Sequence, residues 1–205
     1  MSSPETRAGV RRLGVFGGSF DPVHAGHLIL AQDILERGGL DHVVFVPAAR
    51  NPLKASGPLA SGKDRADMLR AALCGTERFS VSTVDIDRPP PSYALETVAA
   101  LRREWPGASL SWILGEDQLP DLHRWHRIED LADEVEFLVL RRRGETSGLP
   151  GFPGLRLRAV DTRLIELSST EVRNRIASGK PVDFFVRSVV IEIIEKRHLY
   201  ATARS

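Results

Sequence analysis

The sequence predicts an α/β fold, in which an open parallel sheet carries helices on both faces and a small helical part follows toward the C-terminal end. Short apolar, β-branched runs alternate with segments whose apolar residues recur at helical spacing, which is typical of parallel sheets with crossover helices. At 205 residues with 42% hydrophobic residues, the chain is long enough for one substantial core. We therefore expect a single domain over residues 1–205, with the helical portion at about 168–200.

The first half of the chain supplies three strands and two helices. The strands are expected in the apolar, β-branched runs at 12–16, 42–47 and 79–86. A helix over 27–37 is indicated by apolar residues at helical spacing, and Gly38 marks its end. A second helix is expected to begin at Ser61, because Asp64 follows three residues later in the pattern of a helix start.

The second half continues the same rhythm. A helix is expected to open at Ser92 and to end at Pro106-Gly107. Further strands are expected at 109–115, 136–140, 155–160 and 164–167. Further helices are expected around 128–132 and near 169–178 and 182–197. Residues 143–154 are rich in glycine and proline and are expected to form a surface loop.

Composition argues against several classes of function. Lys plus Arg number 28 and Asp plus Glu number 27, so the net charge of +1 gives no reason to expect a nucleic acid or a membrane surface as partner. The single cysteine, Cys74, excludes an internal disulfide and fits a reducing compartment. The first residues form no apolar leader and no run of about 18 apolar residues occurs, so we expect a cytoplasmic protein. The sequence does not decide between a monomer and a homo-oligomer.

The segment GGSFDPVHAGH, from Gly17 to His27, combines the features of an anion site. Gly17 and Gly18 lack Cβ atoms where a backbone would approach a polyphosphate, and the following helix presents N–H groups at its N-terminus. The segment also follows a strand of the expected parallel sheet, where ligands of such sheets bind. It matches neither G-x-G-x-x-G nor G-x-x-x-x-G-K-[ST], so the two common nucleotide-binding glycine loops are excluded.

The two histidines of this segment are three residues apart. If a helix begins at His27, both His24 and His27 point toward the same mouth of the sheet, where they can donate to phosphate oxygens. Surface or capping histidines are the alternative from these residues alone. A metal site is a weaker alternative, because HRWH at 123–126 repeats the spacing, but only Cys74 can supply a thiolate and H-E-x-x-H does not occur. We therefore expect no metal site built by protein side chains.

GGSFDPVHAGH resembles, at all eleven positions, the motif GG-[ST]-F-[DN]-P-x-H-x-G-H of the nucleotidyltransferases that make dinucleotide cofactors. The resemblance implies a Rossmann-like fold of the nucleotidyltransferase type and ATP as co-substrate with Mg²⁺. It also implies that Gly17, Gly18, Ser19 and Phe20 line the ATP site. His24 and His27 would contact the phosphates through the transition state.

A second phosphate-binding element is indicated by LSSTEVRNRI, from Leu167 to Ile176. Ser168 and Glu171 form a capping box, which places Ser169 and Thr170 in the first helical turn with outward hydroxyls. An ordinary well-capped helix explains these residues equally well. The segment resembles the second motif of the same family, I-S-[ST]-T-x-x-R, which implies that Ser169, Thr170 and Arg173 bind ATP phosphates.

Three further segments resemble the nicotinate mononucleotide adenylyltransferase branch. They are NPLK at 51–54, PPSYALETV at 90–98 and GEDQLPDLHRW at 115–125. The resemblance implies that Lys54 contacts phosphate beside His24, His27 and Arg173. It further implies a substrate site at Tyr93, Ala94, Thr97, Asp117 and Trp125.

The chain departs from this branch where Ala94 replaces the usual Thr and His126 follows the Trp in place of Tyr. The expected reaction is transfer of AMP from ATP to nicotinate mononucleotide, giving nicotinate adenine dinucleotide and pyrophosphate. The alternatives are a sibling enzyme acting on nicotinamide mononucleotide or phosphopantetheine, and a non-catalytic nucleotide-binding module. The expected partners are therefore ATP and a pyridine mononucleotide.

Overall fold

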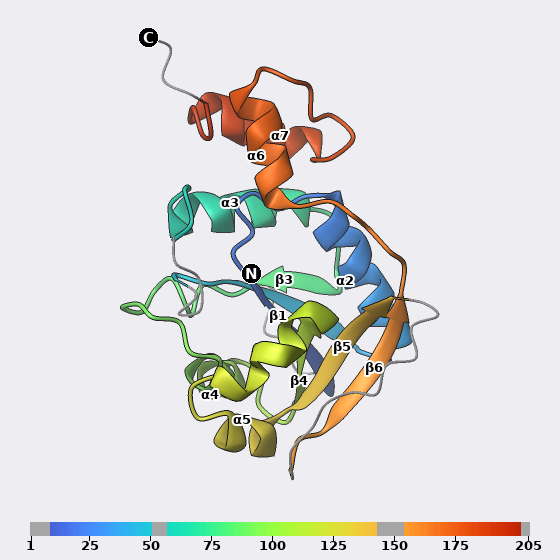
Figure 1. Ribbon diagram of the computed structural model, residues 1–205. Helices are drawn as coiled ribbons and strands as arrows, with labels where there is room; N and C mark the ends of the chain where they lie inside the picture. The colour runs from blue at the N-terminus through green and yellow to red at the C-terminus, as the bar shows by residue number, and fades with distance from the viewer. Residues whose placement is uncertain (1–8, 51–56, 143–153, 202–205) are drawn as a thin grey trace.

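The computed structural model of the chain describes residues 9–50, 57–142 and 154–201. Within these ranges, six strands pair in parallel into one sheet in the order β3-β2-β1-β4-β5-β6 (Figure 1). The strands are β1 (Arg12–Gly18), β2 (His42–Pro47), β3 (Phe79–Val81), β4 (Ser109–Gly115), β5 (Glu136–Arg142) and β6 (Leu157–Thr162). This order is that of the Rossmann fold, so the expected fold class is confirmed.

Helices cover both faces of the sheet. The α-helices are α2 (Ala25–Arg37), α3 (Gly62–Ala72), α4 (Ala94–Glu104), α5 (Ile128–Glu134), α6 (Ser169–Ala177) and α7 (Ser188–Lys196). A 3-10 helix, η1 (Glu116–Arg124), follows β4. Helices α2 and α3 pack on one face, and α4 and α5 pack on the other. Helices α6 and α7 lie beyond α3 and form the C-terminal helical part (Figure 1).

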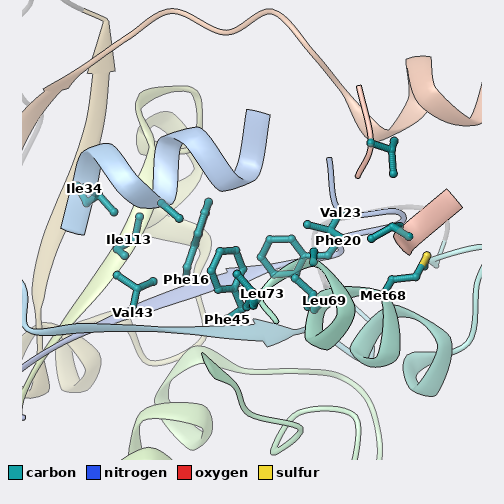
Figure 2. Packing of buried hydrophobic residues seen from close by; sticks show 14 of the residues in the cluster. Phe16, Phe20, Val23, Ile34, Val43, Phe45, Met68, Leu69, Leu73 and Ile113 are labelled. Atoms are coloured by element: carbon teal, nitrogen blue, oxygen red, sulfur yellow. The ribbon is translucent and has the colours of Figure 1, made fainter. Parts of the chain in front are cut away.

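The strands divide their side chains between two cores, because successive residues of a strand point to opposite faces. In β1, Leu13 and Val15 are buried against α4 and α5, whereas Phe16 is buried on the face covered by α2 and α3. On the latter face, the ring of Phe16 lies 5.3 Å from that of Phe45 between centroids, and Phe20 joins them (Figure 2). The loop after β1 is therefore anchored in the core by an aromatic side chain.

Two of the expected strands are wrong in extent. The strand expected at 79–86 ends at Val81, because Thr83 and Asp87 close a turn in which the Thr83 hydroxyl donates to the Asp87 carboxylate (2.7 Å). The strand expected at 164–167 does not form, since β6 is followed by a crossing segment toward α6. Asp33 of α2 accepts the backbone N–H of Arg163 (3.1 Å) and so directs the chain away from the sheet.

The helix starts also differ in detail. Ser61 caps α3 as expected, but α2 begins at Ala25 with His24 as its N-cap, two residues before the expected start. Ser92 does not cap α4, because its hydroxyl accepts the N–H of Ala49 (2.9 Å). The last helix, α7, begins at Ser188, and 182–187 are outside it.

The sheet order places the site. The chain runs from β1 outward to β2 and β3, then returns to β4 on the other side of β1. Loops leaving the carboxyl ends of β1 and β4 therefore go to opposite faces and open a crevice between them, which is where such sheets bind ligands. No helix in the described ranges is long and apolar enough to cross a membrane.

Candidate active site

The glycine loop begins at the carboxyl end of β1, where Gly17 and Gly18 are the last residues of the strand. A Cβ on Gly17 would lie 3.0 Å from the indole of Trp112, and one on Gly18 would lie 2.9 Å from the ring of Phe20. Larger residues would therefore displace the aromatic rings on which this loop rests. Phe20 has a left-handed backbone (φ 47°) and is 1% exposed, so its ring belongs to the core. The expected role of Phe20 in lining the ATP site stays a prediction.

His24 and His27 lie together at the start of α2. Their rings are stacked with centroids 3.7 Å apart. The Nδ1 atom of His27 accepts the backbone N–H of His24 at 3.3 Å. A neutral His27 ring that accepts at Nδ1 carries its proton on Nε2, so Nε2 is the atom that can donate to an anion.

His24 is the more buried of the pair. It is 5% exposed, and no described residue gives its Nδ1 atom a hydrogen-bond partner. Burial lowers the pKa of His24 from 6.5 to about 4, because the charged imidazolium loses its hydration. His24 is therefore neutral near pH 7 and acts as a hydrogen-bond donor or acceptor, not as a cation.

The second expected motif docks on the turn that leads to these histidines. Ser168 caps α6 by accepting the N–H of Glu171 (3.1 Å), as the capping box predicted. The Ser169 hydroxyl donates to the carbonyl oxygen of Pro22 (2.9 Å). Arg173 donates to the carbonyl oxygen of Asp21 (2.7 Å) and to the Thr170 hydroxyl (3.1 Å). Segments about 150 residues apart in sequence thus form one local structure.

A cavity of about 630 Å³ opens between the ends of β1 and β4. Gly17, Gly18 and Ser19 form one part of its wall. Among the residues expected to bind the acceptor substrate, those lining the cavity are Tyr93, Ala94, Asp117 and Trp125. His24 and His27 are not among the residues that line it and lie beside the glycine loop. Their role in binding phosphate, like that of the second motif, stays a prediction.

Aromatic side chains form much of the cavity wall. The Tyr93 ring is stacked on that of His126 with centroids 4.2 Å apart. The rings of Trp125 and Trp112 meet edge to face, with centroids 5.8 Å apart. A wall of this kind suits a flat heteroaromatic ring, which gains contact area on both faces. His126, one of the departures from the expected pattern, is therefore placed directly at this wall.

Thr97 does not line the cavity. It is fully buried, and its hydroxyl bonds with the carboxylate of Asp85 and with the carbonyl oxygen of Tyr93 (3.1 Å). Thr97 therefore lies behind the cavity wall, and its expected contact with substrate stays a prediction. Asp85 is itself a cavity residue that the sequence reasoning missed, because an acidic residue at the end of an apolar run carries no distinctive signal. Burial raises the pKa of Asp85 even though Arg88 lies 2.5 Å away.

Sequence reasoning also missed Arg65. This side chain is 1% exposed and donates to the carbonyl oxygens of Ser19 (2.7 Å) and Ala60 (3.2 Å). Arg65 lies within the helix that the sequence predicts from Ser61, where a single arginine carries no distinctive signal. Lys54, expected to contact phosphate, lies outside the described residues.

Candidate metal ligands do not cluster in the part of the chain that the structure describes. There, no three His, Cys, Asp or Glu residues come together in an arrangement that could hold a metal ion.

The geometry is that of a nucleotide-binding α/β protein, with a glycine loop and two histidines at the sheet's switch point and an aromatic pocket beside them.

Comparison with known proteins agrees with this class. The model of the cytidylyltransferase-like family matches residues 15–175. A protein of Opitutus terrae is 43% identical over 92% of this chain and 97% of its own length, and one of Gemmatimonas aurantiaca is 40% identical over 92% of each. Both carry the name "Probable nicotinate-nucleotide adenylyltransferase". The chain belongs to the cytidylyltransferase-like family and, within it, to the nicotinate-nucleotide adenylyltransferases.

The fold agrees with solved structures of low sequence identity. A Plasmodium falciparum nicotinic acid mononucleotide adenylyltransferase complexed with NaAD superposes with a TM-score of 0.72 at 17% identity, over 93% of this chain and 97% of that one. The same protein complexed with APC superposes with a TM-score of 0.70. At this level of identity the likeness supports the fold alone.

Proposed function

We propose that the protein transfers AMP from ATP to nicotinate mononucleotide, giving nicotinate adenine dinucleotide and pyrophosphate. The observation that carries this proposal is the continuous cavity whose wall joins Gly17, Gly18 and Ser19 to Tyr93 and Trp125. A glycine loop that accepts phosphates and an aromatic wall that accepts a pyridine ring are thus parts of one site. The names of the relatives support the same reaction.

The reaction needs no protein nucleophile. An oxygen of the mononucleotide phosphate attacks the α-phosphorus of ATP, a new P–O bond forms, and the bond between the α-phosphorus and the oxygen that leads to the β-phosphorus breaks. The attacking phosphate is already anionic at neutral pH, so no general base has to remove a proton. Catalysis then consists of positioning the two phosphates and stabilising negative charge on the departing pyrophosphate.

The described residues can supply this stabilisation from two sides. His27 presents Nε2–H from the first turn of α2, and His24 is stacked against it as a neutral ring. Arg173 lies on α6, which docks on the turn before these histidines. We assign the γ- and β-phosphates of ATP to the region between the starts of α2 and α6. From the resemblance, we assign Lys54 to the same phosphates. Ser169 and Thr170, at the start of α6, are assigned to the same phosphates.

The proposed Mg²⁺ enters with ATP. Phosphate oxygens are donors that suit this ion, as is usual for Mg²⁺ at nucleotide sites. When bound, it supplies charge neutralisation on the triphosphate.

The acceptor half of the site is assigned to the aromatic wall. Trp125, Tyr93 and His126 provide flat surfaces for the pyridine ring, and Asp117 lies at the same cavity with its carboxylate folded toward Gly115. Ala94 begins α4, so backbone N–H groups of that helix start are available to a carboxylate of the substrate. This arrangement supports nicotinate as the ring, although Ala94 offers no side-chain hydroxyl.

The decisive experiment measures pyrophosphate release at fixed ATP and Mg²⁺ with three acceptors tested separately. Nicotinate mononucleotide is expected to support the highest kcat/KM, followed by nicotinamide mononucleotide, with no release from phosphopantetheine. A preference for either of the other acceptors would identify a sibling transferase. Binding of ATP without pyrophosphate release from any acceptor would identify a nucleotide-binding module and would overturn the proposal.

A further inference from the structure

The hydroxyl of Tyr200 donates to the carboxylate of Asp21 over 2.7 Å, although the two residues are 179 positions apart. Tyr200 lies in the turn that follows α7, and both His198 (φ 51°) and Tyr200 (φ 63°) adopt the left-handed backbone region there. Left-handed conformations are uncommon for residues with side chains, so tertiary contacts must hold this turn in place. The Tyr200 ring packs against the core on the α2 and α3 side, which brings its hydroxyl to Asp21.

Asp21 connects this turn to the glycine loop. Its carboxylate is 3% exposed and accepts three hydrogen bonds, from the backbone N–H groups of Leu59 (2.7 Å) and Ala60 (3.0 Å) and from Tyr200. The guanidinium of Arg173 lies 3.9 Å from the same carboxylate. Asp21 lies in the short segment between Ser19 and His24, so the contacts that hold its side chain also restrain this segment.

The main chain of the same turn is held from the C-terminal helices. Arg173 and Ser169 donate to the carbonyl oxygens of Asp21 and Pro22. The carbonyl oxygen of Phe185 accepts the N–H of Ala25, the first residue of α2 (2.8 Å). The C-terminal part therefore contacts this turn in two ways. It binds the backbone carbonyl oxygens of the turn, and it binds the carboxylate of Asp21.

We propose that Tyr200 is a positioning residue for AMP transfer, whose hydroxyl orients the Asp21 carboxylate and thereby fixes the turn that aims His24 and His27. Tyr200 touches neither substrate in this assignment. The inference rests on the proposed function, because the histidines are taken to act on the phosphates of ATP. It makes the last turn of the described chain a working part of the ATP site.

The donor is suited to this task at every working pH. Burial, followed by the hydrogen bond to Asp21, raises the pKa of the Tyr200 hydroxyl well above its ordinary value of 10.0. The hydroxyl therefore stays protonated and donates.

Docking of α7 does not depend on this hydroxyl. Helix α7 packs on α3 through buried Val190 and Ile194. Arg197 adds ion pairs to Asp64 (2.6 Å) and Asp67 (2.9 Å) on α3. Tyr200→Phe is therefore expected to leave these contacts in place. Arg197→Gln is expected to weaken the docking of α7 without removing the hydrogen bond between Tyr200 and Asp21. The two sites thus provide a variant and its matched control.

The test compares Tyr200→Phe with Arg197→Gln in the full-length chain. Tyr200→Phe is expected to lower kcat about tenfold, the size of one hydrogen bond to a charged group, while the KM for nicotinate mononucleotide changes less than about twofold. Arg197→Gln is expected to lower Tm by a few degrees and to leave kcat unchanged. An unchanged kcat in Tyr200→Phe would overturn the proposal, as would an equal loss of kcat in Arg197→Gln.

A measurement without substrate separates this inference from the proposed function. In ¹H–¹⁵N spectra of the imidazole rings, the signals of His24 and His27 are expected to shift in Tyr200→Phe and to stay unchanged in Arg197→Gln. If wild-type protein released no pyrophosphate with any acceptor, the proposed function would fail, and the spectra would still decide whether Tyr200 positions the histidines. Identical histidine signals in wild type and Tyr200→Phe would show that it does not.

Discussion

The guanidinium of Arg65 donates to the carbonyl oxygen of Ser19 over 2.7 Å and so links α3 to the glycine loop. Its Nε atom also donates to the carbonyl oxygen of Ala60. The Asp21 carboxylate accepts the N–H of Ala60, so both backbone polar groups of Ala60 are hydrogen-bonded. Ala60 is 5% exposed, so its carbonyl oxygen has no ready access to replacement water, whereas Ser19 lines the cavity.

Replacing Arg65 by Met is therefore expected to destabilise the protein by about 2 kcal/mol, since the buried carbonyl oxygen of Ala60 loses its donor. Urea unfolding followed by circular dichroism measures this loss. Arg70→Met is the matched control, because Arg70 lies on the same helix, is exposed and pairs only with Asp67 in the described contacts. Its expected cost is within about 0.5 kcal/mol. Equal effects of the two substitutions would contradict the role of Arg65.

Replacing His27 by Ala is expected to lower kcat about a hundredfold or more, because a donor aimed at developing charge is removed. Far-ultraviolet circular dichroism should show the wild-type helix content. His123→Ala serves as the control, since His123 is exposed in η1 and is not among the residues lining the cavity. A folded His27→Ala enzyme with wild-type turnover would refute the assignment of the phosphate site.

The stability of the protein is expected to fall as pH decreases from about 6.5 to about 4, in part because of His24. Its pKa is depressed in the folded state, so in this window the unfolded chain takes up a proton that the folded chain does not. The contribution is therefore present above pH 6.5, is lost through the window and amounts to roughly 3 kcal/mol.

Urea unfolding of wild type and His24→Asn at several pH values isolates the contribution of His24 to the pH dependence of stability, because the other titrating groups are common to both proteins. The difference in unfolding free energy between them should change over this window and become constant below it. A difference that does not vary with pH would show that His24 titrates normally in the folded state.

Replacing Gly26 by Ala is expected to lower activity without lowering stability. A Cβ at this position would lie 3.0 Å from Nδ1 of His24 and 3.3 Å from Cγ2 of Ile165, so the imidazole must shift by a few tenths of an ångström, whereas Ala is a better helix residue than Gly. We expect kcat to fall at least about tenfold from misplacement of the ring, with Tm unchanged or higher. Gly57→Ala is the control, since no atom lies within 4 Å of its Cβ position. Wild-type kcat in Gly26→Ala would show that the His24 ring tolerates displacement.

Periodicity and motif spacing predicted most of this architecture. The parallel order follows from alternating strands and helices, and the capping pairs at Ser61 and Ser168 are where the sequence placed them. These features are local, so local residues determine them. The strand expected at 164–167 failed because its apolar residues cross to α6, a path set by the distant carboxylate of Asp33.

The candidate site likewise contains residues that local sequence predicts and residues that depend on distant contacts. Residues in contiguous motifs, such as His24 and Ser169, could be selected from the sequence. Arg65, Asp85 and the stack of Tyr93 on His126 depend on elements that meet only in three dimensions. Thr97 shows a limit of motif reading, because membership of a motif does not reveal whether a side chain faces the cavity or the packing behind it.

The contact between Ser169 and Pro22 spans 147 positions of the chain. During synthesis the strand and helix that carry the histidines emerge first, long before α6 exists to hold the turn ahead of them. Contacts between distant segments also form late in folding, since closing a long loop costs entropy before the contact is made. The chain can therefore acquire much of its sheet early, whereas the proposed phosphate site becomes complete only after α6 has been made and has docked on the turn before α2.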